Sequence, residues 1–204
     1  MQLKILPTVL FIVVLALASV IIYLVIDSEN ADNVTTISNT SATNSATETI
    51  TEQNCVADDC LLVNGLEYPA STLPEAVITA LGKAIDDEYK ARATYEAVIE
   101  KLGSIRPFSM IIRAEEQHIS SLKAIYDKYG VAIPADPYNP DTLDIPDTVA
   151  SSCNLGVDAE IANAALYRDE LLSEVSTYPD IVAVFENLMN ASQDKHLPAF
   201  RKCS

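Results

Sequence analysis

The sequence predicts an all-α protein: a four-helix bundle with one long crossover between its second and third helices, preceded by a transmembrane helix and a flexible linker. An uncharged apolar run comes first, and a segment rich in Ser, Thr and Asn follows it. Four segments then repeat apolar residues at spacings of three and four, which places them on one helix face. We therefore divide the chain into an anchor, a linker, a Cys-bracketed lead-in and a helical domain, at residues 1–26, 27–54, 55–71 and 72–204.

The anchor is predicted from residues 5–26, which carry no charge. A helix of this length, at about 1.5 Å per residue, spans the hydrocarbon core of a bilayer. Lys4 precedes the run and Asp27 follows it, so the positive-inside rule places the N-terminus in the cytoplasm. A signal peptide cleaved after Ala18 is the alternative, but the apolar run continues beyond Ala18 and favours a retained, single-pass anchor in the cell membrane. In both cases the C-terminal domain is extracytoplasmic.

The linker is predicted from residues 27–54. They include 11 Ser or Thr and five Asn, with almost no large apolar side chain. Such a segment cannot bury enough surface to offset the entropy of ordering it.

The whole chain is acidic, with 29 Asp and Glu against 13 Lys and Arg. Nucleic acids and anionic membrane surfaces attract basic patches, so this composition argues against nucleic acid as a partner. Five Gly in the chain leave little for a phosphate-binding loop or a dinucleotide fingerprint.

The first two helices have clear start and stop signals. One is predicted from about Pro74 to Leu102, and the next begins at Pro107 and ends at Gly130, because Pro suits a first turn and Gly follows a last turn. Their predicted core faces are Val77, Leu81, Ala84, Glu88, Ala91, Tyr95, Val98 and Leu102, and Phe108, Ile111, Glu115, His118, Leu122, Ile125 and Tyr129.

The third and fourth helices are predicted from about Val157 to Ser176 and from about Asp180 to Arg201. Pro198 removes a backbone hydrogen bond to Asp194, so the fourth helix is expected to bend beside His196. The predicted core faces are Val157, Glu160, Ala164, Tyr167 and Leu171, and Val182, Phe185, Met189, Gln193, His196 and Phe200.

Residues 131–153 connect the second and third helices. A connection of this length is uncommon unless it has a function, and crossing the length of a bundle is such a function. Two antiparallel hairpins joined by one long crossover have the ferritin-like connectivity.

Export favours disulfides. Four Cys allow three pairings, and we prefer Cys55–Cys60 with Cys153–Cys203, since the last two lie at one end of an antiparallel helix pair. A metal knuckle at Cys55 and Cys60 is the alternative for that pair, but the chain has no second pair of comparable spacing.

Three carboxylates and both His of the chain fall on the predicted core faces. Charged groups in a core are costly unless they are paired or bind metal. A pattern occurs twice: Glu, six residues and Tyr, followed in the next helix by Glu or Gln, two residues and His. The residues in this pattern are Glu88, Tyr95, Glu115 and His118 in the first half, and Glu160, Tyr167, Gln193 and His196 in the second. Such a set is typical of a di-iron or di-manganese carboxylate site.

From about residue 72 to 203 the chain resembles ferritin-like proteins of the rubrerythrin kind, and is most similar to an uncharacterised ferritin-like family. Residues 84–91, 114–118 and 191–200 carry the resemblance. The resemblance implies a di-iron centre, with manganese as the alternative. In it Glu88 and Glu160 each bind one ion, Glu115 bridges, and His118 and His196 each bind one ion. Tyr95 and Tyr167 would then hydrogen-bond to ligands or carry electrons, beside the alternative of core packing.

Gln193 departs from the di-iron pattern, which has a second bridging Glu at that position. An amide is neutral, so two divalent ions would meet three carboxylates instead of four. A dinuclear site, a mononuclear site and a metal-free relic therefore all stay open at this point.

Two functions remain in competition. One is a ferroxidase- or peroxidase-type iron oxidoreductase that reacts with O₂ or peroxide. The other is a non-catalytic bundle that sequesters metal or docks another protein. No Cys-x-x-Cys pair of the rubredoxin type follows the bundle. A membrane tether on each subunit disfavours a closed cage and leaves a homodimer open.

Overall fold

The computed structural model describes residues 60–63 and 65–204. The predicted anchor, the predicted linker and Cys55 lie outside the described residues. In the described part of the chain, no helix is both long enough and apolar enough to cross a membrane. The described chain is mostly helical, as predicted for an all-α protein, and its only strands are β1 (Leu62–Val63) and β2 (Leu66–Glu67), a short antiparallel hairpin.

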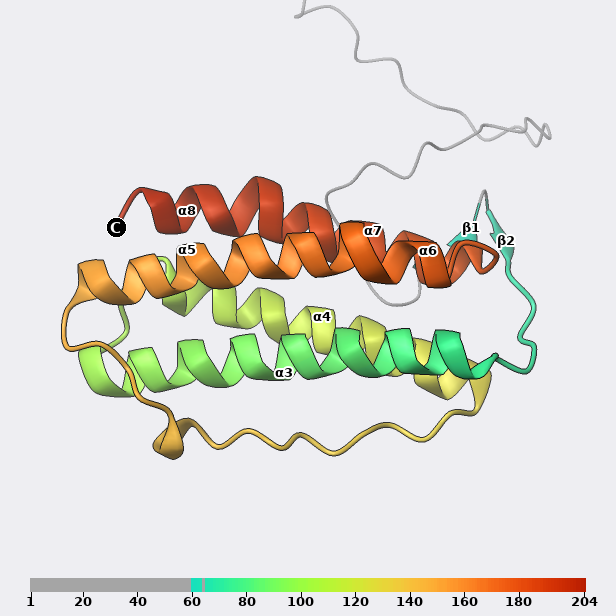
Figure 1. Ribbon diagram of the computed structural model, residues 1–204, viewed down its shortest axis with the longest axis horizontal. Helices are drawn as coiled ribbons and strands as arrows, with labels where there is room; N and C mark the ends of the chain where they lie inside the picture. The colour runs from blue at the N-terminus through green and yellow to red at the C-terminus, as the bar shows by residue number, and fades with distance from the viewer. Residues whose placement is uncertain (1–59, 64) are drawn as a thin grey trace, which may run out of the picture. The chain divides into compact units, whose positions relative to one another are not determined.

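Four long helical segments lie side by side (Figure 1). The first pair is α3 (Glu75–Leu102) and α4 (Phe108–Tyr129), which matches the predicted first and second helices. Gly130 follows α4 with φ 64°, a left-handed conformation that Gly adopts without steric cost. The N–H of Val131 then donates to the carbonyl of Tyr126 and completes the end of the helix.

The third helical segment begins earlier than predicted. It consists of α5 (Val149–Leu166), a π-helical turn η2 (Tyr167–Leu171) and α6 (Leu172–Glu174). The predicted start at Val157 was wrong because the Ser-rich stretch before it has the composition of a loop. Thr148 caps this stretch, and its side chain accepts a hydrogen bond from the N–H of Ser151 at 3.2 Å.

The fourth helical segment is interrupted where Pro198 was expected to bend it. It consists of α7 (Pro179–Ala191), a π-helical turn η3 (Ser192–His196) and α8 (Leu197–Arg201). Pro198 has no N–H to donate to the carbonyl of Asp194. The N–H of Leu197 instead reaches back five residues to the carbonyl of Ser192, which is the π-helical bond.

The crossover therefore covers residues 131–148 and runs along the bundle beside α3 (Figure 1). A 3-10 turn, η1 (Pro140–Thr142), interrupts it. Arg92 on α3 forms an ion pair with Asp136 at 2.5 Å, and Tyr138 donates a hydrogen bond to Asp86 at 3.1 Å. These contacts hold the long connection against the helix that it follows.

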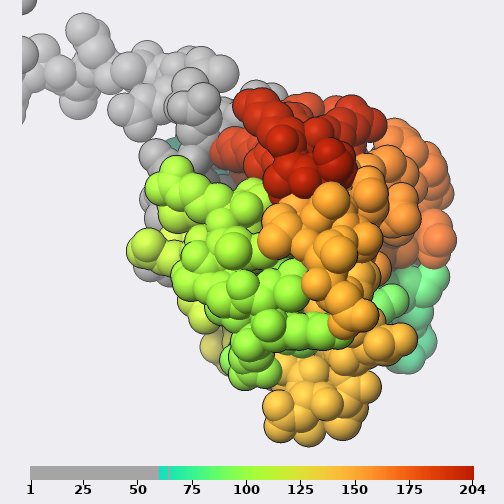
Figure 2. Space-filling view, turned by 90° about the vertical axis from the view of Figure 1, so that its left-hand side faces the viewer, coloured from blue at the N-terminus to red at the C-terminus, as the bar shows by residue number. Residues whose placement is uncertain are grey.

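The predicted disulfide between Cys153 and Cys203 is confirmed. It joins the first part of α5 to the chain end after α8, and the view of this end of the bundle shows the two segments side by side, in orange and red (Figure 2). Cys60 is also disulfide-bonded, and Cys55, its predicted partner, lies outside the described residues.

The core has two apolar clusters separated by a polar layer. One cluster lies toward the hairpin end and includes Leu81, Leu122 and Phe185. The other lies toward the Cys153–Cys203 disulfide and includes Phe108 and Phe200. Along all four helical segments, the predicted ligands lie between residues of one cluster and residues of the other. The layer between the clusters holds the buried side chains of Glu88, Glu115, Glu160 and His196.

Candidate metal centre

All four helical segments contribute side chains to the polar layer. Glu88 comes from α3, Glu115 and His118 from α4, Glu160 from α5, and His196 from η3. The side chain of His118 is 12% exposed, whereas those of the other four are at most 6% exposed. The edge of His118 is therefore the part of this group that solvent reaches most easily.

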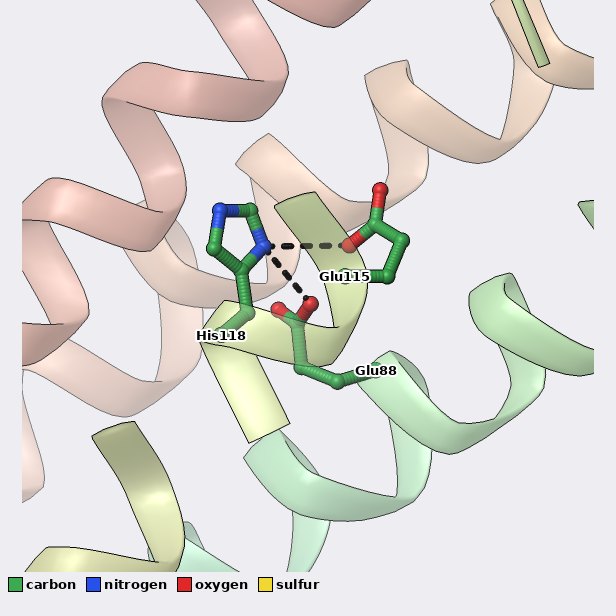
Figure 3. A group of neighbouring side chains, drawn as sticks. All are labelled: Glu88, Glu115 and His118. Atoms are coloured by element: carbon green, nitrogen blue, oxygen red, sulfur yellow. Dashed lines mark hydrogen bonds and ion pairs between the residues drawn. The ribbon is translucent and has the colours of Figure 1, made fainter. Parts of the chain in front are cut away.

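The first group of contacts surrounds His118. Its Nδ1 atom lies 3.0 Å from Oε2 of Glu88 and 3.0 Å from Oε2 of Glu115, while its other ring nitrogen points away from both carboxylates (Figure 3). Three atoms that suit a metal ion thus converge from two helices, because Glu115 and His118 are one turn apart on the same face of α4.

The second group of contacts surrounds His196. Its Nδ1 atom lies 3.2 Å from Oε1 of Glu115 and 3.4 Å from Oε2 of Glu160. Glu115 therefore directs one carboxylate oxygen toward each His. The two imidazole rings are stacked with their centroids 5.5 Å apart. This is the arrangement expected of a bridging carboxylate between two ion positions.

The donor set fits a metal ion. In each group, one atom from each of the three residues lies within 4.8 Å of the other two. Nδ1 of His196 is buried and makes no hydrogen bond, although two carboxylates are close to it. In the metal-free protein a proton on this nitrogen pairs with the two carboxylates, and a metal ion bound between them would replace that proton. Imidazole and carboxylate together are ligands of iron, manganese and zinc.

Without metal, protons take the place of the cations. Burial acts to lower the pKa of His118, but Glu88 and Glu115 outweigh it and raise the pKa to about 10. Burial also acts to lower the pKa of His196, but Glu115 and Glu160 outweigh it and raise the pKa to about 9. Both imidazoles are therefore cationic in the metal-free protein at neutral pH, and a metal ion must displace their protons.

The two carboxyls bound to His118 differ in pKa. Burial raises the pKa of Glu88 to about 7, although His118 partly offsets this effect. Burial also acts to raise the pKa of Glu115, but His118 and His196 together hold it well below its ordinary value. Glu115 thus stays ionised between the two imidazoles, as a bridging ligand must.

Two buried Tyr side chains hold the outer carboxylates in place. Tyr95 of α3 donates a hydrogen bond to Oε1 of Glu160 at 2.6 Å, and Tyr167 donates to Oε1 of Glu88 at 2.9 Å. Burial and the nearby carboxylates raise the pKa of both hydroxyls well above the ordinary value, so both remain donors. In each Glu, Oε1 faces a Tyr and Oε2 faces a His.

Gln193 is not part of the centre. Its side chain is exposed, and its amide nitrogen donates to Asp194 at 3.2 Å. Phe185, His196 and Phe200 of the predicted face of the fourth helix are buried, whereas Gln193 is not. Ser192 is the buried residue at this level, and it lies one α-helical turn beyond the buried Leu188. The position where a fourth carboxylate was expected therefore holds a hydroxyl.

Three polar residues beside the centre were not predicted from the sequence: Asn163, Ser192 and Asp87. The amide nitrogen of Asn163 donates to Oδ2 of Asp87 at 2.7 Å and lies 3.3 Å from Oε1 of Glu88. The hydroxyl of Ser192 donates to Oδ1 of Asn163 at 2.7 Å. A signal was present in the sequence, because Asn163 follows Glu160 at the same spacing at which His118 follows Glu115.

Comparisons with protein-family models, with curated proteins and with solved structures found no match to this chain. The candidate site therefore depends on the positions and chemistry of its own side chains.

Proposed function

We propose that this protein is an exported, membrane-anchored protein of the ferritin-like kind that holds two iron ions and acts as a non-haem iron oxidoreductase. The observation that supports this is the pair of largely buried Glu–Glu–His groups that share Glu115. Glu88, Glu115 and His118 would hold one ion, and Glu115, Glu160 and His196 the other. Manganese is the alternative metal.

Bound iron would supply the one-electron chemistry needed to react with O₂ or peroxide. The chain supplies the rest. Tyr95 and Tyr167 fix the orientation of Glu160 and Glu88, and apolar clusters on both sides of the polar layer exclude water. The 12% exposed edge of His118 is the side from which an ion or a small oxidant would approach.

Metal content and activity test this proposal. Full-length protein in detergent, loaded with ferrous iron without oxygen, should retain about two ions per chain and should then consume O₂ or peroxide. Glu115→Gln should lose both ions, because Glu115 serves both positions. Glu116→Gln is the matched control, since Glu116 is exposed and the same charge is removed. Fewer than about 0.2 ions per wild-type chain, with no change in melting temperature, would refute metal binding.

A non-catalytic bundle that sequesters metal or docks a protein is the second candidate. The observation that favours it is the side chain of Ser192, which supplies a hydroxyl where a fourth carboxylate was expected. This alternative predicts retained metal with no consumption of O₂ or peroxide above that of Glu115→Gln.

A further inference from the structure

A chain of three hydrogen-bonded side chains borders the metal centre where the fourth carboxylate is missing. It runs from Ser192 through Asn163 to Asp87, and the bonds at its two ends are both 2.7 Å. Asn163 and Ser192 are buried, and Asp87 is partly buried. The three side chains have defined roles: the hydroxyl of Ser192 donates to the amide oxygen of Asn163, and the amide nitrogen of Asn163 donates to the carboxylate of Asp87.

The amide nitrogen of Asn163 connects Asp87 to the centre. It lies within hydrogen-bonding distance of both Asp87 and the ligand Glu88. Among the residues the structure describes, Asp87 has no Lys, Arg or His within salt-bridge distance, whereas its exposed neighbour Asp86 bonds to Tyr138 on the crossover. Burial of this carboxylate is costly. Lys90 offsets part of the cost from beyond salt-bridge distance, and ions in the centre would offset more of it.

The charge of the centre makes this carboxylate significant. Two divalent ions carry four positive charges, and Glu88, Glu115 and Glu160 supply three negative charges when ionised. One positive charge is then left unbalanced in a buried layer, and this mainly weakens the affinity for the second ion to bind. When ionised, Asp87 supplies one negative charge, which is the amount needed.

We propose that Asp87, acting through Asn163, supplies the fourth negative charge of the centre and so determines whether the second ion binds. Asp87 is a positioning residue and not a ligand. Ser192 holds the amide of Asn163 in the orientation that presents its nitrogen to both carboxylates. This inference rests on the two-ion centre proposed above.

Titration with Mn(II), which does not require a redox reaction, tests the role of Asp87 in the full-length protein. The substitution Asp87→Asn removes the charge and preserves shape. We expect it to raise the dissociation constant of the second ion by about 10- to 100-fold, with the first changed by less than about threefold. Asp86→Asn is the matched control: it removes the same charge one residue earlier and should leave both constants unchanged.

An exchange variant separates charge from structure. Asp87→Asn combined with Asn163→Asp moves the carboxylate one position inward and retains a donor–acceptor pair between the two residues. We expect it to restore the second dissociation constant to within about threefold of the wild type, or to make it smaller. A purely structural role for Asp87 predicts no such rescue.

The outcomes are distinct. If wild-type protein binds two ions and Asp87→Asn behaves like Asp86→Asn, the inference is overturned and the two-ion centre stands. If Asp87→Asn weakens both ions equally and the exchange variant does not recover, the role is structural and the inference is also overturned. If wild-type protein binds no Mn(II) or iron, both the centre and the inference fail.

Discussion

The metal-free protein should lose stability as the pH rises from about 6.5 to 10. The folded pKa values of His118 and His196 are about 10 and about 9, against an ordinary value of 6.5. A raised folded pKa means that the folded state binds the proton more tightly than the unfolded chain does. The resulting stabilisation is fully present below pH 6.5 and is lost as the pH rises through 9 and 10.

The magnitude follows from proton counting. Each proton that the folded state holds and the unfolded chain lacks changes the free energy of unfolding by about 1.4 kcal/mol per pH unit. For a domain of this size, about 1.4 kcal/mol corresponds to roughly 4 °C in melting temperature. The pKa of Glu88 is also raised, to about 7, so Glu88 also stabilises the folded state when protonated. This stabilisation is lost as the pH rises from 4.5 to 7. Glu115 acts oppositely, and its contribution is lost as the pH falls below 4.5.

The assay is thermal unfolding of chelator-treated, full-length protein, followed by circular dichroism between pH 5 and 10. The double variant His118→Gln and His196→Gln is the control, because it keeps the general repulsion of an acidic protein and removes both imidazoles, together with the effect by which they lower the pKa of Glu115. We expect the wild type to lose stability more steeply than this variant between pH 7 and 9. With saturating Mn(II), the melting temperature should instead rise with pH below pH 7, since protons on the ligands compete with the ion at low pH. Equal slopes for wild type and double variant would refute the assignment of cationic imidazoles.

Two further predictions concern the fold. Gly156→Ala should destabilise the protein by about 1–3 kcal/mol, because the added Cβ would lie 2.6 Å from the buried ring of Phe200. Gly82→Ala should stabilise it by about 0.5–1 kcal/mol, because open space surrounds that position in α3. Chemical unfolding measures both variants, and an equal effect on the free energy of unfolding would contradict the packing. Replacing Cys153 and Cys203 together with Ala should cost about 4 kcal/mol, as expected for a cross-link that closes a loop of 50 residues, and a loss below about 1 kcal/mol would show that the unfolded chain is not restrained by this bond.

Much of the centre could be predicted because burial and charge conflict in the sequence. Glu88, Glu115 and Glu160 each interrupt an apolar helix face, and such an interruption is tolerated only where partners exist. The ends of α3 and α4 could be predicted for a local reason, since Pro and Gly act within one turn of where they occur. Neither inference needed knowledge of the neighbouring helices.

The errors occurred where tertiary contacts override local pattern. The start of α5 at Val149 is rich in small and polar residues, and its helix is stabilised by the disulfide at Cys153 and by the packing of Gly156 against Phe200. Gln193 was placed inward on the assumption of an uninterrupted helical period. The fourth helix instead contains a π-helical turn, in which Ser192 and His196 are buried and Gln193 is exposed.

The two halves of the bundle are related but not equivalent. Tyr95 from the first half donates a hydrogen bond to Glu160 in the second, and Tyr167 from the second donates one to Glu88 in the first. The two halves are therefore joined by a symmetric pair of hydrogen bonds. The symmetry ends at Asn163, whose amide nitrogen adds a second donor near Oε1 of Glu88, while Oε1 of Glu160 receives only Tyr95 among the described residues. Donors favour the ionised form of a carboxylate. In the proposed two-ion centre, the two positions should therefore bind with different affinity, and one ion should be easier to remove than the other.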